Sequence, residues 1–406
     1  MNDWHLKQLD VNNAFLHGEL HEEIYMQVPP GMDSSAGQVC KLNKSLYGLR
    51  QANKQWYEKL SSFLILQGYA RSNVDHSLFL RRTENSMTIA LVYVDDITLA
   101  GNDVVEIEKL THLLNETFKI KNLGDLTYFL RLEVARNKTG IHLCQRKYVL
   151  DLLEGARMMN CAPAITPMNH KLAANIGGIL PDPSSYRRLI GKLIYLTNTR
   201  PDITHAVQHL SQFVYAPTSI HQQAAMRILR YLKKTPGNGI FLAANSEAQL
   251  KRYSDSDWAG CAETRKSVTG YIIYFGNSPT SWRSKKQPTV SRSSSEAKYK
   301  ALAATTCEIQ WLKYLLDDIG INHRSPTVLY CDNQSAIQIA SNQVMHERTK
   351  HIEIDCHIVR EKINNGLLKL LPVSSKSQLA DILTKPLPPI DFKSICFKLG
   401  MLNLYS

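Results

Sequence analysis

One stretch decides the fold of the first part of this chain: Met87-Thr88-Ile89-Ala90-Leu91-Val92-Tyr93-Val94-Asp95-Asp96-Ile97-Thr98-Leu99-Ala100-Gly101. The apolar residues before the two aspartates predict a buried strand, and those after them predict the returning strand of a hairpin. Adjacent carboxylates repel each other and are costly beside apolar strands unless a cation neutralises them. Because Mg²⁺ favours carboxylate and phosphate oxygens, the hairpin indicates metal-assisted phosphoryl chemistry. Taken alone, an Asp-Asp pair is more often a solvated turn.

A third aspartate, Asp10, ends another predicted strand. It follows an alternating run, Trp4 to Leu9, and precedes Val11-Asn12-Asn13-Ala14-Phe15. A two-metal site draws its carboxylates from separate strands, so Asp10 would complete such a site if the fold brings it beside Asp95. The sequence leaves that placement open.

Hydrophobic periodicity predicts the remaining elements. In the first 150 residues it predicts helices over 55–66 and 104–118 and a hairpin formed by 128–134 and 141–144. Three further helices are predicted over 186–197, 203–213 and 219–234. An α/β pattern follows, with strands over 249–253, 270–275, 280–282, 327–331 and 367–372 and helices over 296–316, 334–341, 354–364 and 377–384.

Three motifs, in this order, resemble the reverse transcriptases of copia-type LTR retrotransposons. They are Asp10-Val11-x-x-Ala14-Phe15, Lys44-Ser45-Leu46-Tyr47-Gly48-Leu49-Arg50-Gln51-Ala52 and Tyr93-Val94-Asp95-Asp96. The likeness continues into an RNase H segment and covers nearly all 406 residues. It implies an α+β polymerase palm with the fingers largely missing, a helical thumb/connection, and then an α/β RNase H-like domain. The expected boundaries are 1–150 for the truncated palm, 151–245 for the thumb/connection, 246–388 for the RNase H-like domain and 389–406 for a C-terminal tail.

The resemblance implies a role for each polymerase aspartate. Asp10, Asp95 and Asp96 match the three catalytic, metal-binding aspartates of the family. Asp10 and Asp95 would be the main ligands of two Mg²⁺ ions, with Mn²⁺ as the alternative, and Asp96 would belong to the same cluster. The metals would lower the pKa of the primer 3′-hydroxyl and steady the leaving pyrophosphate.

Four residues are expected to contact the substrate. Phe15 matches an aromatic gate whose ring excludes a ribose 2′-oxygen, although an Ala-Phe pair taken alone is more often core packing. The segment that lines the templating base pair and the dNTP pocket is matched by Tyr47, Gly48 and Arg50.

Three departures from the family pattern predict an impaired polymerase. Asn53 replaces a proline, and Arg131 replaces a glycine of the primer-grip hairpin, where a glycine would permit a positive φ. The family's fingers precede Asp10 and hold the dNTP triphosphate with basic residues, for which Lys7 and His5 are the only candidates in this sequence. We therefore expect weak positioning and weak charge stabilisation of the triphosphate.

A second two-metal site is expected in the RNase H segment. Asp255, Asp332 and Asp381 match three of its four catalytic, metal-binding acids. The remaining acid is the second glutamate of the family motif S-S-x-E-A-E-Y, where this chain has Ser293-Ser294-Ser295-Glu296-Ala297-Lys298-Tyr299. Glu296 lies on another side of the expected helix, and the Lys298 ammonium opposes metal binding. Hybrid cleavage is expected to be severely reduced or absent, while hybrid binding could survive.

The charge balance favours a polyanionic partner. The chain has 48 Lys and Arg against 36 Asp and Glu, and residues 265–300 hold eight basic residues and one acid, which indicates a nucleic-acid face. Net charge alone also fits an ordinary basic protein. The helix over 219–234 carries a basic stripe that is either a solvated face or, from the resemblance, part of a duplex grip. The implied partners are an RNA template, a DNA primer, an RNA–DNA hybrid and dNTPs, with a homo-oligomer or other Pol and Gag products as further options.

Cysteine and hydropathy patterns bear on the compartment. The eight cysteines are scattered without a C-x-x-C pair, which indicates a reducing compartment. We find no apolar run of membrane-spanning length and no signal-peptide pattern, so a cytoplasmic (virus-like particle) or nuclear location is expected rather than secretion or a membrane.

The leading interpretation is an RNA-directed DNA polymerase with an RNase H domain, both using two-metal phosphoryl transfer and both impaired in this chain. The alternative is a catalytically inactive nucleic-acid-binding retrotransposon remnant. An integrase or protease finds no support, because neither a His/Cys zinc pattern nor an Asp-Ser/Thr-Gly motif is present.

Overall fold

The computed structural model describes residues 4–33, 35, 37–321, 325–342 and 353–403. The backbone forms two compact units, which are described separately. Unit 1 comprises Met1–Phe129 with Tyr314–Ile321, and unit 2 comprises Leu130–Lys313 with Asn322–Ser406.

Unit 1 is built on a six-stranded antiparallel sheet in the order β4-β5-β6-β7-β1-β8. The strands are β1 (His5–Val11), β4 (Ala70–Arg71), β5 (Leu78–Arg82), β6 (Met87–Tyr93), β7 (Asp96–Gly101) and β8 (Ile120–Asp125). The predicted hairpin of β6 and β7 is confirmed, and it lies at the centre of the sheet. The sequence pattern did not predict β8, a largely exposed strand without a continuous apolar stripe.

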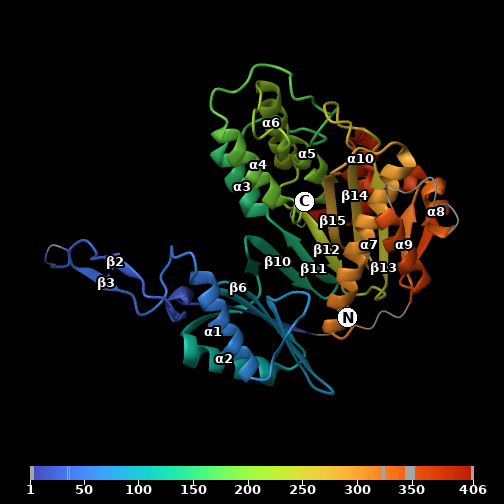
Figure 1. The fold of residues 1–406 in the computed structure, drawn as a ribbon. Helices are drawn as coiled ribbons and strands as arrows, with labels where there is room; N and C mark the ends of the chain where they lie inside the picture. The colour runs from blue at the N-terminus through green and yellow to red at the C-terminus, as the bar shows by residue number, and fades with distance from the viewer. Residues whose placement is uncertain (1–3, 34, 36, 322–324, 343–352, 404–406) are drawn as a thin grey trace. The chain divides into compact units, whose positions relative to one another are not determined.

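Two helices pack against this sheet through one apolar core (Figure 1). They are α1 (Ala52–Leu66) and α2 (Val104–Phe118), both close to their predicted ranges. In α2 the buried residues Ile107, Leu110 and Leu114 recur at helical spacing, so one stripe faces the core. The Asp103 side chain caps its first turn by accepting from the Glu106 amide at 3.0 Å.

The part of the chain between β1 and α1 forms a short 3-10 helix, η1 (Ala14–His17), and a two-stranded ribbon. The ribbon pairs β2 (Tyr25–Gln27) with β3 (Val39–Lys41), and a bridge between Glu19 and Lys44 closes its base. It is drawn at the far end of unit 1 in Figure 1. The remaining strand assigned to this unit is β9 (Tyr128–Phe129).

Unit 2 contains a five-stranded sheet in the order β15-β14-β13-β16-β17. The first three strands are antiparallel, whereas β16 runs parallel to both β13 and β17. The strands are β13 (Leu250–Ser256), β14 (Val268–Phe275), β15 (Ser278–Lys286), β16 (Thr327–Cys331) and β17 (Leu368–Pro372). This mixed order agrees with the α/β pattern predicted from the sequence.

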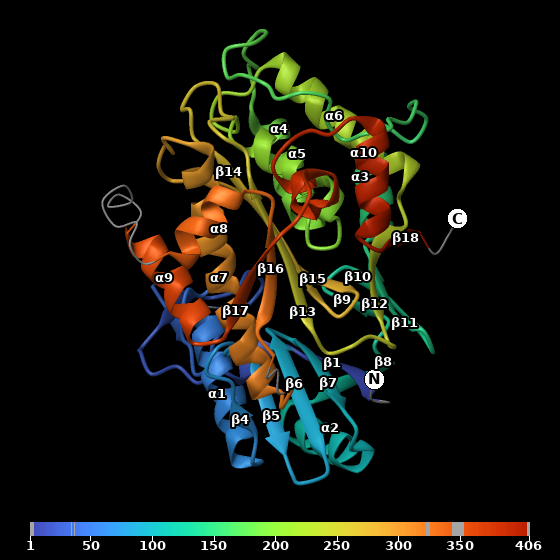
Figure 2. The same cartoon turned by 90° about the vertical axis from the view of Figure 1, so that its right-hand side faces the viewer.

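Helices cover both faces of that sheet (Figure 2). On one side lie α7 (Ser294–Asp318), α8 (Gln334–Ser341) and α9 (Glu353–Asn364), which share a core with β16 and β17. On the other lie α4 (Ser184–Leu196), α5 (Pro201–Ser211), α6 (Ser219–Lys234) and α10 (Pro389–Lys398). The predicted helix over 377–384 is two short 3-10 turns instead, η3 (Ser375–Ser377) and η4 (Leu379–Leu383).

The helices of 151–245 share their core with the α/β sheet. Side chains of α4, α5 and α6 pack in one cluster with Ile272 of β14, Leu383 of η4 and Phe392 of α10. The remaining elements are α3 (Arg146–Gly155) and a second sheet that contains β10 (Leu132–Asn137), β11 (Gly140–Cys144), β12 (Asn238–Ala243) and β18 (Met401–Asn403). Since α10 is packed and β18 pairs with β12, residues 389–403 form ordered structure where a tail was expected.

The basic side chains of α6 mostly form hydrogen bonds within unit 2. Arg230 Nε donates to the Ala162 carbonyl at 2.7 Å, and Lys233 Nζ donates to the Cys161 carbonyl at 2.5 Å. Arg227 donates to Thr166 Oγ1 at 3.2 Å. These side chains therefore hold the segment that follows α3 against α6. Over the described part of the chain, no helix is long and apolar enough to cross a membrane.

Candidate functional site

The fold of unit 1 brings its three candidate aspartates to one end of the sheet. Asp10 lies directly opposite Asp96 in the pairing of β1 with β7. The amide of Val11 donates to the Asp95 carbonyl at 2.8 Å, so the β6–β7 turn is held beside the end of β1. The sequence did not determine whether Asp10 lies beside the Asp95–Asp96 turn. The pairing of β1 with β7 places it there.

The turn that carries Asp95 has a strained backbone. Val94 has a φ of 55°, a left-handed conformation that β-branched residues rarely adopt. Its carbonyl accepts a hydrogen bond from Trp56 Nε1 of α1 at 2.7 Å. Trp56 is buried and occupies a core position of its helix, so periodicity indicates packing for it and misses this hydrogen bond to the turn.

The Asp96 carboxyl is partly buried and lies close to the charges of Asp95 and Asp10. Burial raises the pKa of Asp96, and the charges of Asp95 and Asp10 raise it further, while a hydrogen bond from Gln8 opposes this shift. Gln8 is a buried polar residue on β1 that the motif analysis did not single out. A bound cation would relieve the repulsion.

The donor set fits a divalent cation chemically, because it consists of carboxylate oxygens at a strand end and a turn. Among the described residues, however, no three His, Cys, Asp or Glu side chains already lie close enough together to hold a metal ion. Metal binding by Asp10, Asp95 and Asp96 therefore requires these side chains to turn toward a common point.

Two candidate substrate residues lie beside the carboxylates. The rings of Phe15 and Tyr47 are tilted against each other with centroids 4.5 Å apart. Burial raises the pKa of the Tyr47 hydroxyl, and the charges of Asp95 and Asp10 raise it further. This pair of rings and the aspartates thus occupy one neighbourhood of unit 1.

Four other residues were expected to contact the substrate or to hold the dNTP triphosphate: Gly48, Arg50, Lys7 and His5. Their local environments are described one by one. Gly48 has a φ of 95°, which a residue with a side chain would adopt only with strain, and Arg50 is exposed in the same segment. Lys7 Nζ donates to Asp125 Oδ1 at 2.7 Å. Lys7 is therefore already paired, and His5 is exposed at the start of β1.

Arg131 adopts the conformation for which glycine is suited. Its φ is 61°, and the preceding Leu130 has a φ of 47°. The guanidinium carbon lies 5.5 Å from the centre of the Tyr148 ring, and Tyr195 donates to the Leu130 carbonyl. The backbone thus keeps a left-handed turn here although the residue has a large side chain.

The α/β sheet of unit 2 gathers the second set of predicted residues around Lys298. Lys298 Nζ donates to Asp255 Oδ1 of β13 at 2.7 Å and also bonds Asp332 Oδ1, which follows β16. The three side chains are largely buried. Glu296 instead accepts from the Arg292 amide at 2.8 Å and pairs with Lys300 at 2.8 Å.

The same contacts set the ionisation of the cluster. Burial alone would raise the pKa of Asp255, but the Lys298 ammonium and a hydrogen bond from Thr384 lower it overall. The pKa of Asp381 is raised to about 7 by burial and by the charge of Asp255, although Asp381 pairs with Lys385 at 2.8 Å. Burial would lower the pKa of Lys298, yet its two aspartate partners raise it.

A divalent metal does not fit this cluster as it stands. The Lys298 ammonium already lies between Asp255 and Asp332, and like-charge repulsion would oppose a second cation there. Thr384 and Lys385 complete the arrangement, and neither is signalled by the acidic motif alone. The cluster is an internal ion-pair network rather than an open set of metal ligands.

Comparison with known proteins gives consistent results along the chain. Residues 1–170 match the family "Reverse transcriptase (RNA-dependent DNA polymerase)". The "Retrovirus-related Pol polyprotein from transposon RE2" of Arabidopsis thaliana is 45% identical over 405 residues, which are 99% of this chain and 28% of that protein. The corresponding polyprotein from transposon TNT 1-94 of Nicotiana tabacum is 40% identical, covering 98% of this chain and 31% of that protein. The chain thus spans about a third or less of the length of these relatives.

A shorter relative is matched from end to end. The "Putative transposon Ty5-1 protein YCL074W" of Saccharomyces cerevisiae is 30% identical over 308 residues, which are 74% of this chain and 100% of that protein. Among solved structures, LC11-RNase H1 isolated from compost shares 17% identity and covers 34% of this chain and 93% of that chain, with a TM-score of 0.27. A TM-score of 0.27 is too low to assign a fold. The fold of unit 2 is therefore described from its own strand order.

Proposed function

We propose, from the premise that this chain belongs to the Pol polyprotein family of copia-type retrotransposons, that unit 1 carries an RNA-directed DNA polymerase site and that unit 2 carries an RNase H-like domain without cleavage activity. The observation that supports the polymerase site is the register that sets Asp10 opposite Asp96, next to Asp95. An RNA or DNA template, a DNA primer and dNTPs are the proposed partners.

In this proposal Asp10 and Asp95 bind the divalent cations, and Asp96 adds negative charge to the same end of the sheet. When bound, Mg²⁺ or Mn²⁺ supplies charge neutralisation for phosphoryl transfer from a dNTP to a primer hydroxyl. Trp56 fixes the turn that presents Asp95, through its bond to the Val94 carbonyl. Phe15, packed against Tyr47, forms the surface on which the sugar of the nucleotide rests.

Primer extension by the purified chain tests the polymerase proposal. The proposal predicts weak, Mg²⁺-dependent incorporation that Asp95→Asn abolishes. Asp151→Asn is the matched control, because Asp151 is an exposed aspartate of α3. Incorporation that is equal in the wild type and Asp95→Asn would refute the assignment of Asp95.

The second part of the proposal rests on the contacts of Lys298 with Asp255 and Asp332. An ammonium held by two carboxylates neutralises the cluster without a metal, so RNA–DNA hybrid is bound but not cut. Lys298→Glu should restore Mg²⁺-dependent hybrid cleavage, whereas Lys298→Gln, which removes the charge without adding a ligand, should not. Cleavage by the wild type equal to that of Lys298→Glu would contradict the proposal.

A further inference from the structure

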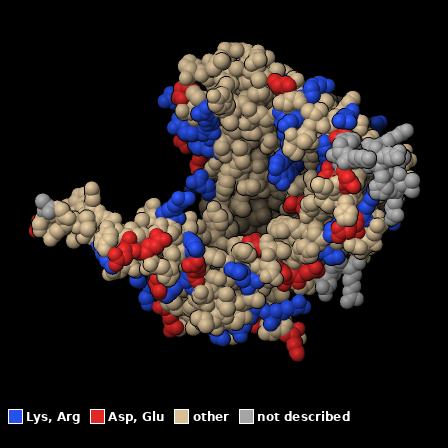
Figure 3. Space-filling model, in the orientation of Figure 1, with Lys and Arg blue, Asp and Glu red and all other residues tan. Residues whose placement is uncertain are grey.

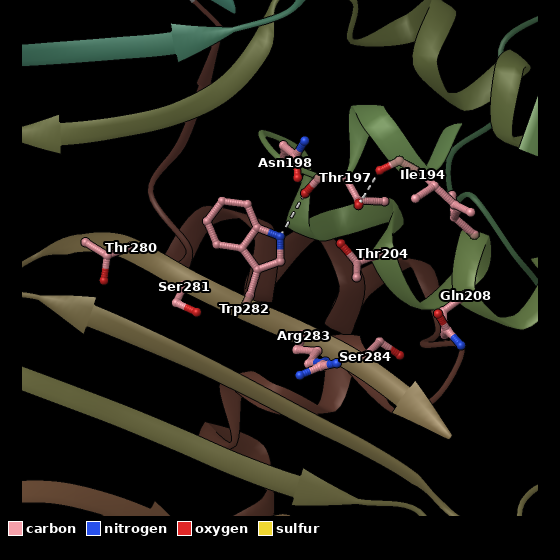
Figure 4. Close-up of a pocket in the computed structure, with 11 residues that line it drawn as sticks. Ile194, Thr197, Asn198, Thr204, Gln208, Thr280, Ser281, Trp282, Arg283 and Ser284 are labelled. Atoms are coloured by element: carbon pink, nitrogen blue, oxygen red, sulfur yellow. Dashed lines mark hydrogen bonds between the residues drawn. The ribbon is translucent and has the colours of Figure 1, made fainter. Parts of the chain in front are cut away.

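Strand β15 and helix α5 pack against each other in unit 2 and carry two neighbouring features. The first is a groove of about 330 Å³, which Ser284 of β15 and Gln208 of α5 help to line (Figure 4). The second follows along the same two elements. Lys286 lies two residues after Ser284, on the same side of the strand, and Gln212, at the C-terminal cap of α5, lies one turn after Gln208.

The second feature is the thiol of Cys261, which contacts side chains from three parts of the fold. Lys286 Nζ lies 2.9 Å from Cys261 Sγ and also donates to Gln212 Oε1 at 3.0 Å. Glu263, in the exposed turn between β13 and β14, has its Oε2 3.3 Å from the same sulfur. The Ala174 amide donates to Oε1 of Glu263, which holds the carboxylate beside the thiol.

These contacts supply a nucleophile with a base and a cation. A carboxylate within hydrogen-bond reach of a thiol can accept its proton, and an ammonium beside the sulfur stabilises the thiolate that results. Burial raises the pKa of the Cys261 thiol, but hydrogen bonds from Lys286 and Thr264 lower it overall. The surroundings of Cys261 are therefore those of an activated thiol rather than of an inert core cysteine.

A general positive field does not single out Cys261. The chain has a formal net charge of +12, and Figure 3 shows Lys and Arg side chains on both units. Such a field favours the thiolate of any cysteine near the surface. Cys307 of α7 is exposed, yet its neighbours desolvate its thiol and, together with the charge of Asp355, raise its pKa. Exposure and activation thus belong to different cysteines of this chain.

The position of the Cys261 thiol favours a small polar reagent. Cys261 is 9% exposed and lies at the base of the exposed turn 262–265. In the neighbouring groove the Ser284 Oγ is buried and has no hydrogen-bond partner among the described residues. A buried hydroxyl without a partner favours water or a molecule of similar size and polarity that completes it. Hydrogen peroxide is such a molecule.

We propose that Cys261 is a modification site, at which a hydroperoxide oxidises the thiol to a sulfenic acid. Glu263 accepts the thiol proton, the sulfur attacks one peroxide oxygen, and the O–O bond breaks. The second oxygen takes up that proton and leaves as water when the reagent is hydrogen peroxide. Lys286 stabilises first the thiolate and then the charge on the leaving oxygen. Sulfur is oxidised and the peroxide is reduced, so the step needs no other reactant.

This site goes beyond the proposed function, because no residue of either carboxylate cluster takes part and neither metal nor dNTP is needed. The competing interpretation is that Cys261, Glu263 and Lys286 only join the turn to β15 and α5. In that case a thiol reacts according to its exposure, and the exposed Cys307 is modified before Cys261. The two interpretations therefore predict opposite orders of reaction.

Hydrogen peroxide with dimedone, a reagent that labels sulfenic acids, tests this order on the full chain. Peptide mass spectrometry measures the labelling rate of each cysteine in the same sample. Cys261 should be labelled about tenfold faster than Cys307. Equal rates, or faster labelling of Cys307, would overturn the proposal. Because this comparison uses the unsubstituted chain in EDTA, it gives a result whether or not the polymerase proposal holds.

Substitutions at Lys286 test the source of the activation. Lys286→Met removes the ammonium and should slow the labelling of Cys261 about tenfold, with the rate at Cys307 unchanged. Lys286→Arg keeps a cation and should retain most of the rate. Lys285→Met, at the adjacent exposed lysine on the other side of β15, is the matched control and should change neither rate. An unchanged rate at Cys261 in Lys286→Met would contradict the role of Lys286.

Discussion

The ammonium nitrogen of Lys298 lies 2.7 Å from Asp255 Oδ1 and also bonds Asp332, so it lies between two aspartates of the proposed RNase H-like domain. The two carboxylate clusters of this chain therefore differ in kind. Burial raises the pKa of Asp96, the charges of Asp95 and Asp10 raise it further, and Lys121 of β8 lies opposite Asp10 in the strand register. Asp255 and Asp332 already share a cation, supplied by the protein itself.

Removing the internal cation should destabilise unit 2. Lys298→Gln leaves Asp255 and Asp332 buried without their shared partner, and loss of one side of a buried ion pair typically costs about 3–5 kcal/mol. Urea unfolding would measure this loss. Lys285→Gln, at an exposed lysine of β15, is the control and should change stability by less than about 0.5 kcal/mol.

The Asp381 carboxyl should make stability fall as pH rises. Its pKa in the folded chain is about 7, raised from 3.8 by burial and by the charge of Asp255. Between about pH 4 and pH 7 the folded state therefore holds a proton that the unfolded state has lost, so the free energy of unfolding decreases across this window. Asp381→Asn should flatten that part of the profile in pH-dependent urea unfolding. A slope that persists unchanged in the variant would contradict the shift.

Arg252 should be a source of instability in unit 2. Its side chain is fully buried on β13, and none of its three guanidinium nitrogens has a hydrogen-bond partner in the structure. Burial lowers its pKa to about 8, with only partial compensation from the charge of Glu308. Arg252→Met keeps much of the volume and removes the charge, so it should stabilise the chain by about 1–4 kcal/mol.

Arg200 provides the matched comparison for Arg252. It is equally buried, but its guanidinium pairs with Asp202 at 2.7 Å and donates to the Thr235 carbonyl at 2.8 Å. Arg200→Met should therefore destabilise by about 3–5 kcal/mol, the opposite sign to Arg252→Met. Thermal unfolding of the two variants side by side measures the contrast, and a loss of similar size in both would show that Arg252 has partners in solution.

Restoring glycine at position 131 should relieve backbone strain. A left-handed φ such as the 61° of Arg131 costs a residue with a side chain about 1–2 kcal/mol relative to glycine. The ring contact with Tyr148 offsets part of this cost, by about 0.5–1 kcal/mol. Arg131→Gly should thus raise the midpoint of denaturant unfolding slightly. A clear loss of stability would mean that the contact with Tyr148 outweighs the strain.

The strongly periodic elements of this fold could be predicted from the sequence. Both helices of unit 1 and the Asp95–Asp96 hairpin agree with their predicted ranges within a few residues, because their apolar stripes face a single core. Elements stabilised by distant pairing were missed. Strand β18 is an example, since it pairs with β12, which lies far away in the sequence.

The candidate sites, like the fold, combine features that the sequence predicts with features that only the folded chain reveals. The motifs predicted the candidate aspartates, and the lysine at position 298 was visible in the sequence, because these are properties of residue type and spacing. The motifs could not identify Gln8, Trp56 or Thr384, whose hydrogen bonds to Asp96, the Val94 carbonyl and Asp255 exist only in the folded chain. Nor could they show that Arg252 is buried without a partner.

Binding of Mn²⁺, followed by electron paramagnetic resonance of the free ion, compares the two clusters most directly. Three forms of the chain are needed: the wild type, Asp10→Asn and Lys298→Glu. If the first cluster needs a cation and the second contains its own, Asp10→Asn will bind less Mn²⁺ than the wild type, and Lys298→Glu will bind more. Equal Mn²⁺ binding by all three forms would contradict the account.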